Sequence, residues 1–599
     1  MNILAGNKQK LIALAISLLI SLALYGNGLR GDFVADDRLV ILQNPAVGGG
    51  LSDFSLAFTN PYYYGQAQTG LYRPLTVASY NANKFINSSP FGFHLANIII
   101  NGLNAFIVFL IVSKLAGRKL AYLSLVLFSF IPIHSEAVSS IVGRAELLSF
   151  FFSALALLSV LRGKLHISSL FLFLGLLSKE TAAGFFLAFI YLWKFYENKS
   201  WKSTAGNALY FIPPIVIYGI LRIYVLGKYF LGVDHLLAYN PLRYEPFLPT
   251  LWTSLKVFWL YLLKTLIPFK LSSDYSFNQI PVIRTPVNYE VLLGLVILVL
   301  VIYLLIFKRT GIYGLSLSIF FFTFIPVSNW FVKIGTIMGE RLMYAPSLGL
   351  VIAGSLYIGR FLSSKDKKVL TRLSYAVIAV VLSAYGFVII SRNRDWRNEE
   401  TLARSAYAAS PNSVVALSNM AYMEFNKKNY PAAKEWIEKA LAVLPDHLSA
   451  LYLAGHIYKN LGDYQAAQES WLKTIKQNPN YSKAYLSLGI LYYELDQPER
   501  AESVLSRAFD LERRWNEAFP LALVKINLGK YDEALRVIEG LGKDSERREL
   551  NFARGLAYLK KGDRKSAGLY LSKVKTSNIS MEEYMAQIIK IRVYKINEY

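Results

Sequence analysis

Cysteine is absent from the 599 residues of this chain. Its absence excludes disulfide bonds, zinc sites with cysteine ligands and catalysis by a thiol. Charged residues are scarce at 17% of the chain, where a soluble globular protein has about 25%. Apolar residues make up 54% and gather in long runs. This distribution predicts a membrane protein with many spans.

Short motifs for nucleotides and metals are also missing. The sequence contains no GxxxxGKS, GxGxxG or HExxH pattern, so a cytosolic nucleotide-driven mechanism has no support. No carboxylate cluster has the spacing of a metal site; we predict none, although a divalent ion stays open. The formal net charge is +24. Because the basic residues flank apolar runs, we attribute the charge to membrane topology and expect no nucleic-acid partner.

Apolar runs near the bilayer-crossing length of about 20 residues recur along the first two thirds of the chain. They lie at 9–28, 92–114, 119–134, 144–162, 165–179, 180–197, 205–226, 250–268, 289–307, 311–330, 341–361 and 370–391. Lys8 and Lys10 precede the apolar stretch from Leu11 to about Tyr25 at this first run, and no small-residue cleavage site follows it. We therefore expect an uncleaved span with a cytoplasmic N-terminus.

Basic residues mark the other inner loops. They are Lys114, Arg118 and Lys119; Arg162 and Lys164; Lys194, Lys199 and Lys202; Lys308 and Arg309; and Lys365, Lys367 and Lys368. The run 205–226 leaves the inner side and 289–307 returns toward it, so 250–268 should not cross. This parity predicts 11 spans with the C-terminus periplasmic, extracellular or luminal. The long outer loops are then 29–91, 227–288 and 331–340, and a chemical site is expected there.

The C-terminal part repeats with a 34-residue period. Prolines recur at 411, 445 and 479, and alanines at 433, 467 and 501. Small residues hold a second register at Ala421, Gly455, Gly489, Ala522 and Gly555. Such a period is typical of tetratricopeptide repeats, in which small residues let two helices approach closely. We expect about five repeats from 413 to 575 and a cap that continues to Tyr599.

These patterns predict an all-α protein with two domains. A transmembrane domain covers 1–391, a connector covers 392–412, and the repeat domain covers 413–599. Because the repeats follow the last span, the parity places them on the outer side. The repeats have no chemistry of their own and offer a surface for a peptide or protein partner.

Two adjacent acids, Asp36 and Asp37, follow the first span directly. One can act as a general base toward an attacking hydroxyl while the other orients it, and Arg38 can balance their charge. A solvated acidic turn is the alternative interpretation. Later in the same loop, Arg73 is a candidate for a bidentate phosphate contact or, alternatively, an interfacial anchor.

Further ionisable residues lie at predicted span ends, where such groups face protein or water and are functional candidates. They are His134, Glu136, Arg144, Glu146, Lys179, Glu180, Glu340 and Arg341. Glu136 can assist the base and Arg144 can hold an anionic donor. Lys179 and Glu180 can instead form a solvated ion pair at a hairpin tip. Glu340 and Arg341 can pair with each other or contact a phosphate.

In their order along the chain, these motifs resemble the transmembrane and tetratricopeptide-repeat O-mannosyltransferases, which are membrane glycosyltransferases of the GT-C fold. The motifs are Phe33-Val34-Ala35-Asp36-Asp37, Tyr72-Arg73-Pro74-Leu75-Thr76, Phe91-Gly92-Phe93-His94, His134-Ser135-Glu136-Ala137-Val138, Ile141-Val142-Gly143-Arg144-Ala145-Glu146, Lys179-Glu180, Ser273-Asp274-Tyr275-Ser276, Gly339-Glu340-Arg341-Leu342-Met343-Tyr344-Ala345-Pro346-Ser347 and Arg392-Asn393-Arg394-Asp395-Trp396. The resemblance covers nearly the whole chain.

The resemblance implies a polyprenyl-phosphate sugar donor, with mannose as the sugar, and a Ser or Thr hydroxyl of a protein as the acceptor. It implies an inverting transfer on the outer face, with Asp36 or Asp37 as the base and Glu136 as a second acidic site residue. Our own candidates for the lipid phosphate are Arg144 and Arg341, with Arg73 and Lys179 as further ones. The chain has only about five repeats, so its acceptor can differ from those of better-known members.

Two rival functions stay open at this point. A related transferase could modify a glycan or a lipid and use the repeats for assembly. A non-catalytic membrane scaffold for secretion or polymer export could also have this architecture. A transporter fits less well, because the ionisable residues gather at outer loops and not at mid-membrane.

Overall fold

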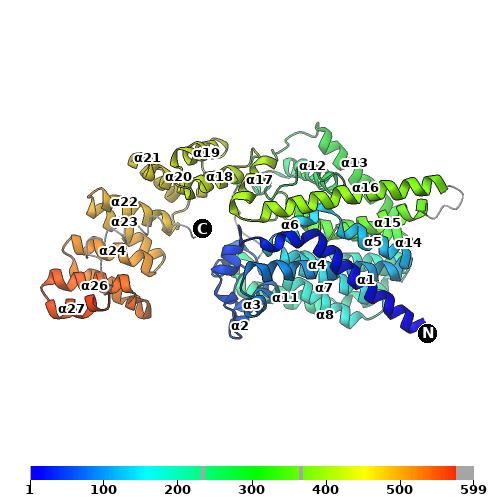
Figure 1. Ribbon diagram of the computed structural model, residues 1–599, viewed down its shortest axis with the longest axis horizontal. Coiled ribbons are helices and arrows are strands. Elements are labelled where there is room, and N and C mark those ends of the chain that lie inside the picture. Colours follow the sequence, from blue (N-terminus) through cyan, green and yellow to red (C-terminus); the bar gives the residue numbers. More distant parts are fainter. Residues whose placement is uncertain (1, 231–236, 363–367, 575–599) are drawn as a thin grey trace. The chain divides into compact units, whose positions relative to one another are not determined.

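The computed structural model describes residues 2–230, 237–362 and 368–574, and within them every regular element is a helix. The prediction of an all-α protein is therefore confirmed. The chain divides into two compact units, Met1–Ala416 and Leu417–Tyr599. Figure 1 shows the helices of the first unit in blue to green and those of the second in yellow to red.

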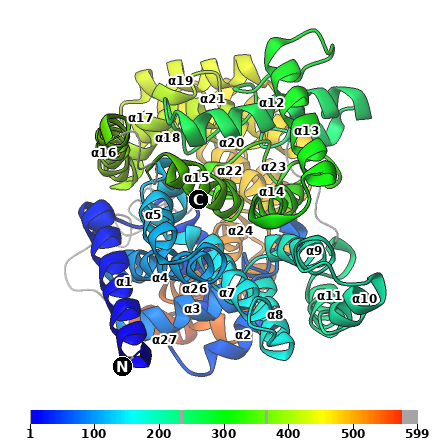
Figure 2. The ribbon, with the colours of Figure 1, turned by 90° about the vertical axis from the view of Figure 1, so that its right-hand side faces the viewer.

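The first unit holds the apolar helices. Its elements are α1 (Asn2–Tyr25), α2 (Asp53–Thr59), α3 (Pro74–Ile86), α4 (Pro90–Ala116), α5 (Arg118–Ser129), α6 (Ser135–Ser139), α7 (Arg144–Val160), α8 (Leu165–Ser178), α9 (Ala183–Tyr191), α10 (Trp201–Leu209), α11 (Ile212–Leu226), α12 (Phe247–Leu266), α13 (Tyr289–Phe307), α14 (Gly311–Phe324), α15 (Ser347–Leu362), α16 (Lys368–Asn393) and α17 (Glu399–Ala409). Helix α4 packs against α1, α5 and α7, and α11 packs against α8 at the edge of the bundle (Figure 2).

Six helices in the described part of the chain are long and apolar enough to cross a membrane, or seven if a bent pair counts as one span. The bent pair joins Arg118–Ser129 to Pro132–Ser139 at an angle of 55°. Three shorter apolar helices are Leu165–Ser178, Gly311–Val327 and Ser347–Arg360. The chain is thus a membrane protein, and the number of 11 spans stays a prediction. Helix α12 is not among the candidate spans.

One predicted span begins later than the sequence suggested. The run 341–361 was expected to be helical from its first residue, but α15 begins at Ser347 and a short 3-10 turn covers Glu340–Met343. Pro346 explains the break, because proline has no N–H to donate and disfavours helical backbone at the residue before it. Arg341 therefore lies before the helix, in the loop region, and not on the helix itself.

Polar side chains inside the bundle bind one another. Asn101 on α4 donates to the Ser21 hydroxyl of α1 at 3.1 Å and accepts from the Tyr344 hydroxyl at 2.7 Å. Asn104, one turn further along α4, donates to the same tyrosine oxygen at 3.1 Å. Hydrogen bonds between apolar helices stabilise the packing, because an unpaired polar group in hydrocarbon is costly. They tie the segment after Arg341 to the centre of the bundle.

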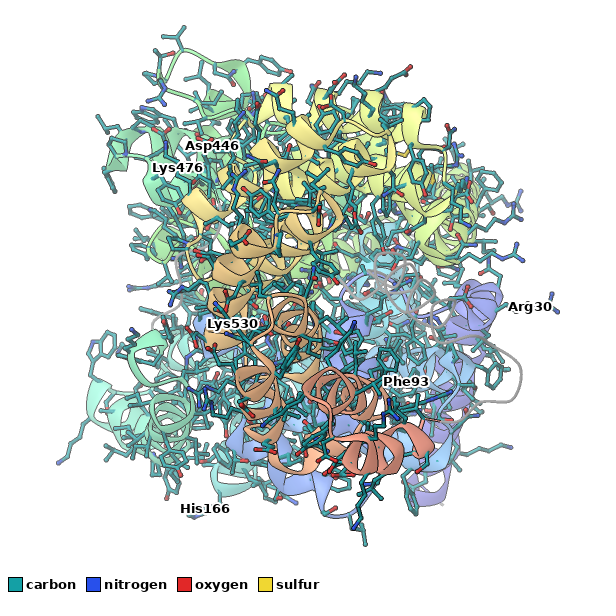
Figure 3. All side chains as sticks on the ribbon, turned by 90° about the vertical axis from the view of Figure 1, so that its left-hand side faces the viewer. Arg30, Phe93, His166, Asp446, Lys476 and Lys530 are labelled. Atoms are coloured by element: carbon teal, nitrogen blue, oxygen red, sulfur yellow. The ribbon has the colours of Figure 1, made fainter. Side chains whose placement is uncertain are left out.

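Up to residue 574, where the described part of the repeat domain ends, the chain forms five helix pairs, the arrangement that the 34-residue period predicts. The pairs are α18 (Val414–Asn426) with α19 (Tyr430–Val443), α20 (Leu448–Asn460) with α21 (Tyr464–Gln477), α22 (Ser482–Glu494) with α23 (Pro498–Leu511), α24 (Trp515–Asn527) with α25 (Tyr531–Glu539), and α26 (Arg548–Lys561) with α27 (Arg564–Ser572). Ion pairs link neighbouring pairs: Lys530, labelled in Figure 3, contacts Glu502 at 2.7 Å. The predicted cap, residues 575–599, lies outside the described residues.

The small residues of the repeats lie where two helices touch. A Cβ atom on Gly455 would lie 2.3 Å from the indole nitrogen of Trp471 in the following helix. Trp471 is fully buried, so its ring cannot move aside freely. The sequence expectation that these positions permit close approach is therefore confirmed.

We predict that Gly455→Ala loosens the second repeat. Overpacking a filled site costs about 1–3 kcal/mol, and hydrogen exchange measured by mass spectrometry over α20 and α21 should speed up. Gly568→Ala is the matched control, because no atom lies within 4 Å of its added Cβ and the residue is helical. Slower or unchanged exchange in Gly455→Ala would contradict the packing described here.

Candidate active site

The two acids after the first span have different surroundings. Asp36 is exposed, whereas Asp37 is fully buried. The Asp37 carboxylate accepts the backbone N–H groups of Val34, at 3.0 Å, and Val142, at 3.1 Å. Burial raises the pKa of Asp37 to about 8, against the effect of these two N–H donors. Asp37 therefore fastens the loop to the residues before α7, and Asp36 is left facing outward.

Asp36 has a tyrosine beside it that sequence reasoning missed. Burial, together with the charge of the nearby Asp36 carboxylate, raises the pKa of Tyr63 well above its usual value. Tyr63 stands in the run Pro61-Tyr62-Tyr63-Tyr64 of the same loop. This aromatic run was the only feature of the sequence that could have indicated a tyrosine near Asp36. It does not indicate which of the three tyrosines lies there.

Glu136 and Arg341 form the second part of the site. Glu136 is buried on α6 and makes an ion pair with the Arg341 guanidinium, while the Arg341 backbone N–H donates to the same carboxylate at 2.8 Å. The negative charge of Glu136 is the largest influence on the pKa of Arg341 and raises it. Burial acts in the opposite direction, and the charge of Asp36 raises the pKa further. The Arg341 side chain keeps 36% of its surface exposed. The structure thus pairs Glu136 with Arg341, and the charge of Asp36 acts on the same guanidinium.

Arg144 is held inside the protein. Its Nε donates to the Asn97 carboxamide at 2.8 Å, and one terminal nitrogen donates to Asn83 and to the Phe93 carbonyl, each at 2.9 Å. The guanidinium also lies over the rings of Tyr80, at 4.8 Å, and Phe93, at 5.4 Å; Phe93 is labelled in Figure 3. Arg144 is only 1% exposed. In this structure it ties α7 to α3 and α4.

The neighbouring residues Lys179 and Glu180 do not pair with each other. Lys179 makes a buried ion pair with Glu146 of α7. Glu180 accepts two hydrogen bonds from Arg73, at 2.8 and 3.2 Å. The interpretation of Lys179 and Glu180 as a solvated pair at a hairpin tip is therefore wrong. A buried charge with an oppositely charged partner destabilises the folded state less than a buried charge without one.

The expected pair of Glu340 with Arg341 is also not formed. Glu340 is fully buried and accepts the Ser272 backbone N–H at 2.6 Å and the Tyr275 hydroxyl at 2.5 Å. Arg392 lies 3.9 Å from its other oxygen. Burial raises the pKa of Glu340 to about 7, and the Arg392 charge opposes this. Glu340 thus connects the loop after α12 to the end of α16.

Two further candidates have structural partners. The His134 ring is buried between Phe128 and Tyr344 and hydrogen-bonds to the Ser347 hydroxyl at 2.9 Å. Arg38, after the acidic pair, makes an ion pair with Glu399 at 3.3 Å. Within the described ranges, no three His, Cys, Asp or Glu side chains are placed to hold a metal ion.

The arrangement suits a displacement reaction at an exposed point. Asp36 can take a proton from a hydroxyl, because its carboxylate faces outward. Arg341 can bind an anion, since a guanidinium with exposed N–H groups matches the geometry of phosphate and carboxylate. Glu136 fixes that guanidinium from its buried side. An exposed carboxylate and a partly exposed guanidinium thus interact through their charges.

Comparison with known proteins points to transferases. The chain is 26% identical over 476 residues to the human protein O-mannosyl-transferase TMTC3, a match that covers 70% of this chain and 50% of that protein. This confirms the resemblance seen in the motifs. Protein O-mannosyl-transferase F38B6.6 of Caenorhabditis elegans is 28% identical over 426 residues, covering 68% and 59%. Human TMTC1 is 26% identical over 479 residues, covering 66% and 51%.

The chain therefore spans about half the length of the curated relatives it matches. A tetratricopeptide-repeat family model matches residues 452–512, inside the second unit. Solved structures similar to the chain include the MamA protein, with 23% identity over 29% of this chain and 93% of that one and a TM-score of 0.25. The tetratricopeptide protein YrrB matches with 21% identity, covering 32% and 98%, and a TM-score of 0.26.

Proposed function

We propose that the protein transfers a mannosyl group from a polyprenyl-phosphate donor to Ser or Thr hydroxyls of an acceptor protein. The similarity to curated protein O-mannosyl-transferases supports this reaction class. The observation that carries the proposal is the exposed Asp36 carboxylate in the loop beyond the first span, whose charge acts on the guanidinium of Arg341, a side chain that is 36% exposed. A transferase of the GT-C fold needs a base and a site for lipid phosphate at that place.

The reaction is a single displacement at the anomeric carbon. The acceptor oxygen forms a bond to that carbon while the bond to the donor phosphate oxygen breaks, and the phosphate leaves with the electron pair. Asp36 takes the hydroxyl proton. Because attack and departure occur on opposite faces, the anomeric configuration inverts. The phosphate charge that develops is stabilised by a preorganised cation.

Asp36 is the base and Asp37 is its support. The carboxylate of Asp37 is buried, and both its oxygens accept backbone N–H groups. An incoming hydroxyl cannot reach it without opening the loop. Tyr63 lies close enough to the accessible Asp36 carboxylate for the charge of Asp36 to raise the pKa of Tyr63.

Arg341 is the best of the four candidate cations for the lipid phosphate. Arg144 is almost fully buried with its N–H groups bound. Arg73 is bound at two nitrogens by Glu180, and Lys179 is paired in a buried position with Glu146. Arg341 is 36% exposed although it binds Glu136. A phosphate can therefore reach Arg341 without displacing its partner.

We further propose that Asp36 and the repeats lie on the outer side of the membrane. The basic loops between the apolar runs support this orientation through the positive-inside rule. Helix pairs of this repeat class form extended surfaces that bind peptides and proteins. In this proposal the repeats hold the acceptor protein during transfer.

We expect Asp36→Asn to lower the rate of mannosyl transfer by about 10²–10⁴-fold, because the amide cannot take the hydroxyl proton. The measurement uses purified protein with polyprenyl-phosphate mannose and an acceptor protein, followed by mass spectrometry of the product. Asp32→Asn is the control, since Asp32 is an exposed acid of the same loop. Full activity of Asp36→Asn would refute Asp36 as the base.

For the phosphate site, Arg341→Gln should lower kcat/KM for the lipid donor by about tenfold to a hundredfold, the range for losing one hydrogen bond to a charged group. Arg284→Gln serves as the comparison, because Arg284 lies on an outer loop, is 67% exposed and is paired with Glu245. Equal effects of the two variants would show a general charge effect and not a phosphate site at Arg341.

Orientation can be tested with single cysteines, because the native chain has none. Tyr244→Cys, before α12, and Thr285→Cys, after it, should both react with a membrane-impermeant maleimide from outside. Both positions are exposed in the structure. Lys308→Cys, on a predicted inner loop, should react only after permeabilisation. Labelling at only one end of α12 would mean that this helix crosses the membrane.

A further inference from the structure

The loop that carries Asp36 is attached to the helix that precedes the repeats. Helix α17 begins after Asn398, whose side chain accepts the Thr401 backbone N–H at 2.9 Å while the Thr401 hydroxyl accepts the Asn398 N–H at 3.1 Å. This capping box fixes the first turn. Glu399 is the first residue of that turn.

Three kinds of contact join the acidic loop to this first turn. The Asp32 backbone N–H donates to the Arg397 carbonyl at 2.9 Å. Val34 forms a buried apolar cluster with Trp396 and Leu402. The loop is therefore joined to the start of α17 by a backbone hydrogen bond and by a small apolar cluster.

Glu399 makes the third contact, next to Asp36. Its Oε1 atom accepts the Ala35 backbone N–H at 3.0 Å and lies 3.3 Å from Arg38 Nε. One carboxylate thus contacts the residue before Asp36 and the residue after Asp37. Its charge also acts on the buried Asp37.

The backbone at Ala35 gives this contact its importance. Ala35 has a φ of +50°, in the left-handed region that an alanine rarely adopts. That conformation is unfavourable for an L-amino acid because Cβ crowds the backbone, so surrounding contacts must maintain it. The hydrogen bond from Ala35 to Glu399 is charge-assisted and holds this residue directly.

We propose that Glu399 is a positioning residue that holds the Ala35 backbone in its left-handed conformation and so directs Asp36 outward. The inference rests on the proposed function in one respect, namely that Asp36 is the base. Glu399 acts through the loop and does not touch the substrate. Through Glu399, the first turn of α17 helps to position the proposed base Asp36.

The first test measures the loop without any enzyme assay. Val34→Cys places a single thiol in the buried cluster with Trp396 and Leu402, so its reaction with a maleimide reports separation of the loop from α17. Adding Glu399→Ala should raise the labelling rate of purified full-length protein about tenfold, the factor for losing one hydrogen bond to a charged group. Adding Glu400→Ala should leave it unchanged, because Glu400 pairs with Arg404 on the surface of the same helix.

The second test measures mannosyl transfer. Glu399→Ala should lower kcat about tenfold with little change in KM for the lipid donor, since the base is misplaced and the phosphate site is intact. Glu399→Gln keeps an oxygen for the Ala35 N–H and should recover most of the loss. Glu400→Ala should behave like the wild type.

The two tests separate the failure of each idea. An unchanged labelling rate in Glu399→Ala overturns the positioning role, whatever the activity. Faster labelling in a protein that transfers no mannose under any condition supports the positioning role and refutes the proposed function. Faster labelling with an unchanged kcat overturns the link between the loop and the base.

Discussion

The buried carboxylate of Asp37 is the interaction on which the candidate site depends. It binds the N–H of Val34 in its own loop and that of Val142 just before α7. Two residues further on, Arg144 binds α3 and α4. The loop that follows α1 is therefore connected to three helices of the bundle. Without this carboxylate, the loop that carries Asp36 would lose its hydrogen bond to the residues before α7.

Pairing of charges decides which groups remain available. Glu146 forms an ion pair with Lys179, Glu180 forms one with Arg73, and Glu340 lies close to Arg392. Each buried charge in a region of low polarity needs such a partner. Arg341 differs in that it has a buried partner and an exposed surface of its own. An exposed cation held in place from behind is what binding of a lipid phosphate requires.

Sequence patterns predicted the repeats well and the site in part. The 34-residue period specifies helix pairs, because Ala433, Gly455 and their equivalents leave room for only one kind of close contact. The acidic pair and Glu136 were found because charged residues near apolar runs are unusual. Their partners were not predictable: Tyr63 and Glu399 are ordinary residues in polar segments, and Glu399 is 364 positions from Ala35. Adjacent residues also suggested wrong pairs at Lys179-Glu180 and Glu340-Arg341.

The sequence by itself determined the class of the protein: membrane spans, a repeat domain after them, and a set of charged residues between apolar runs. These features are local, since hydropathy and periodicity act over one helix or one repeat. Only the tertiary structure decided that Asp36 is the exposed acid, that Arg341 is the cation with an exposed side chain, and that Glu399 contacts the acidic loop. Those roles depend on burial and on hydrogen bonds between distant segments, such as Asp37 with Val142 and Ala35 with Glu399, and no local pattern encodes them.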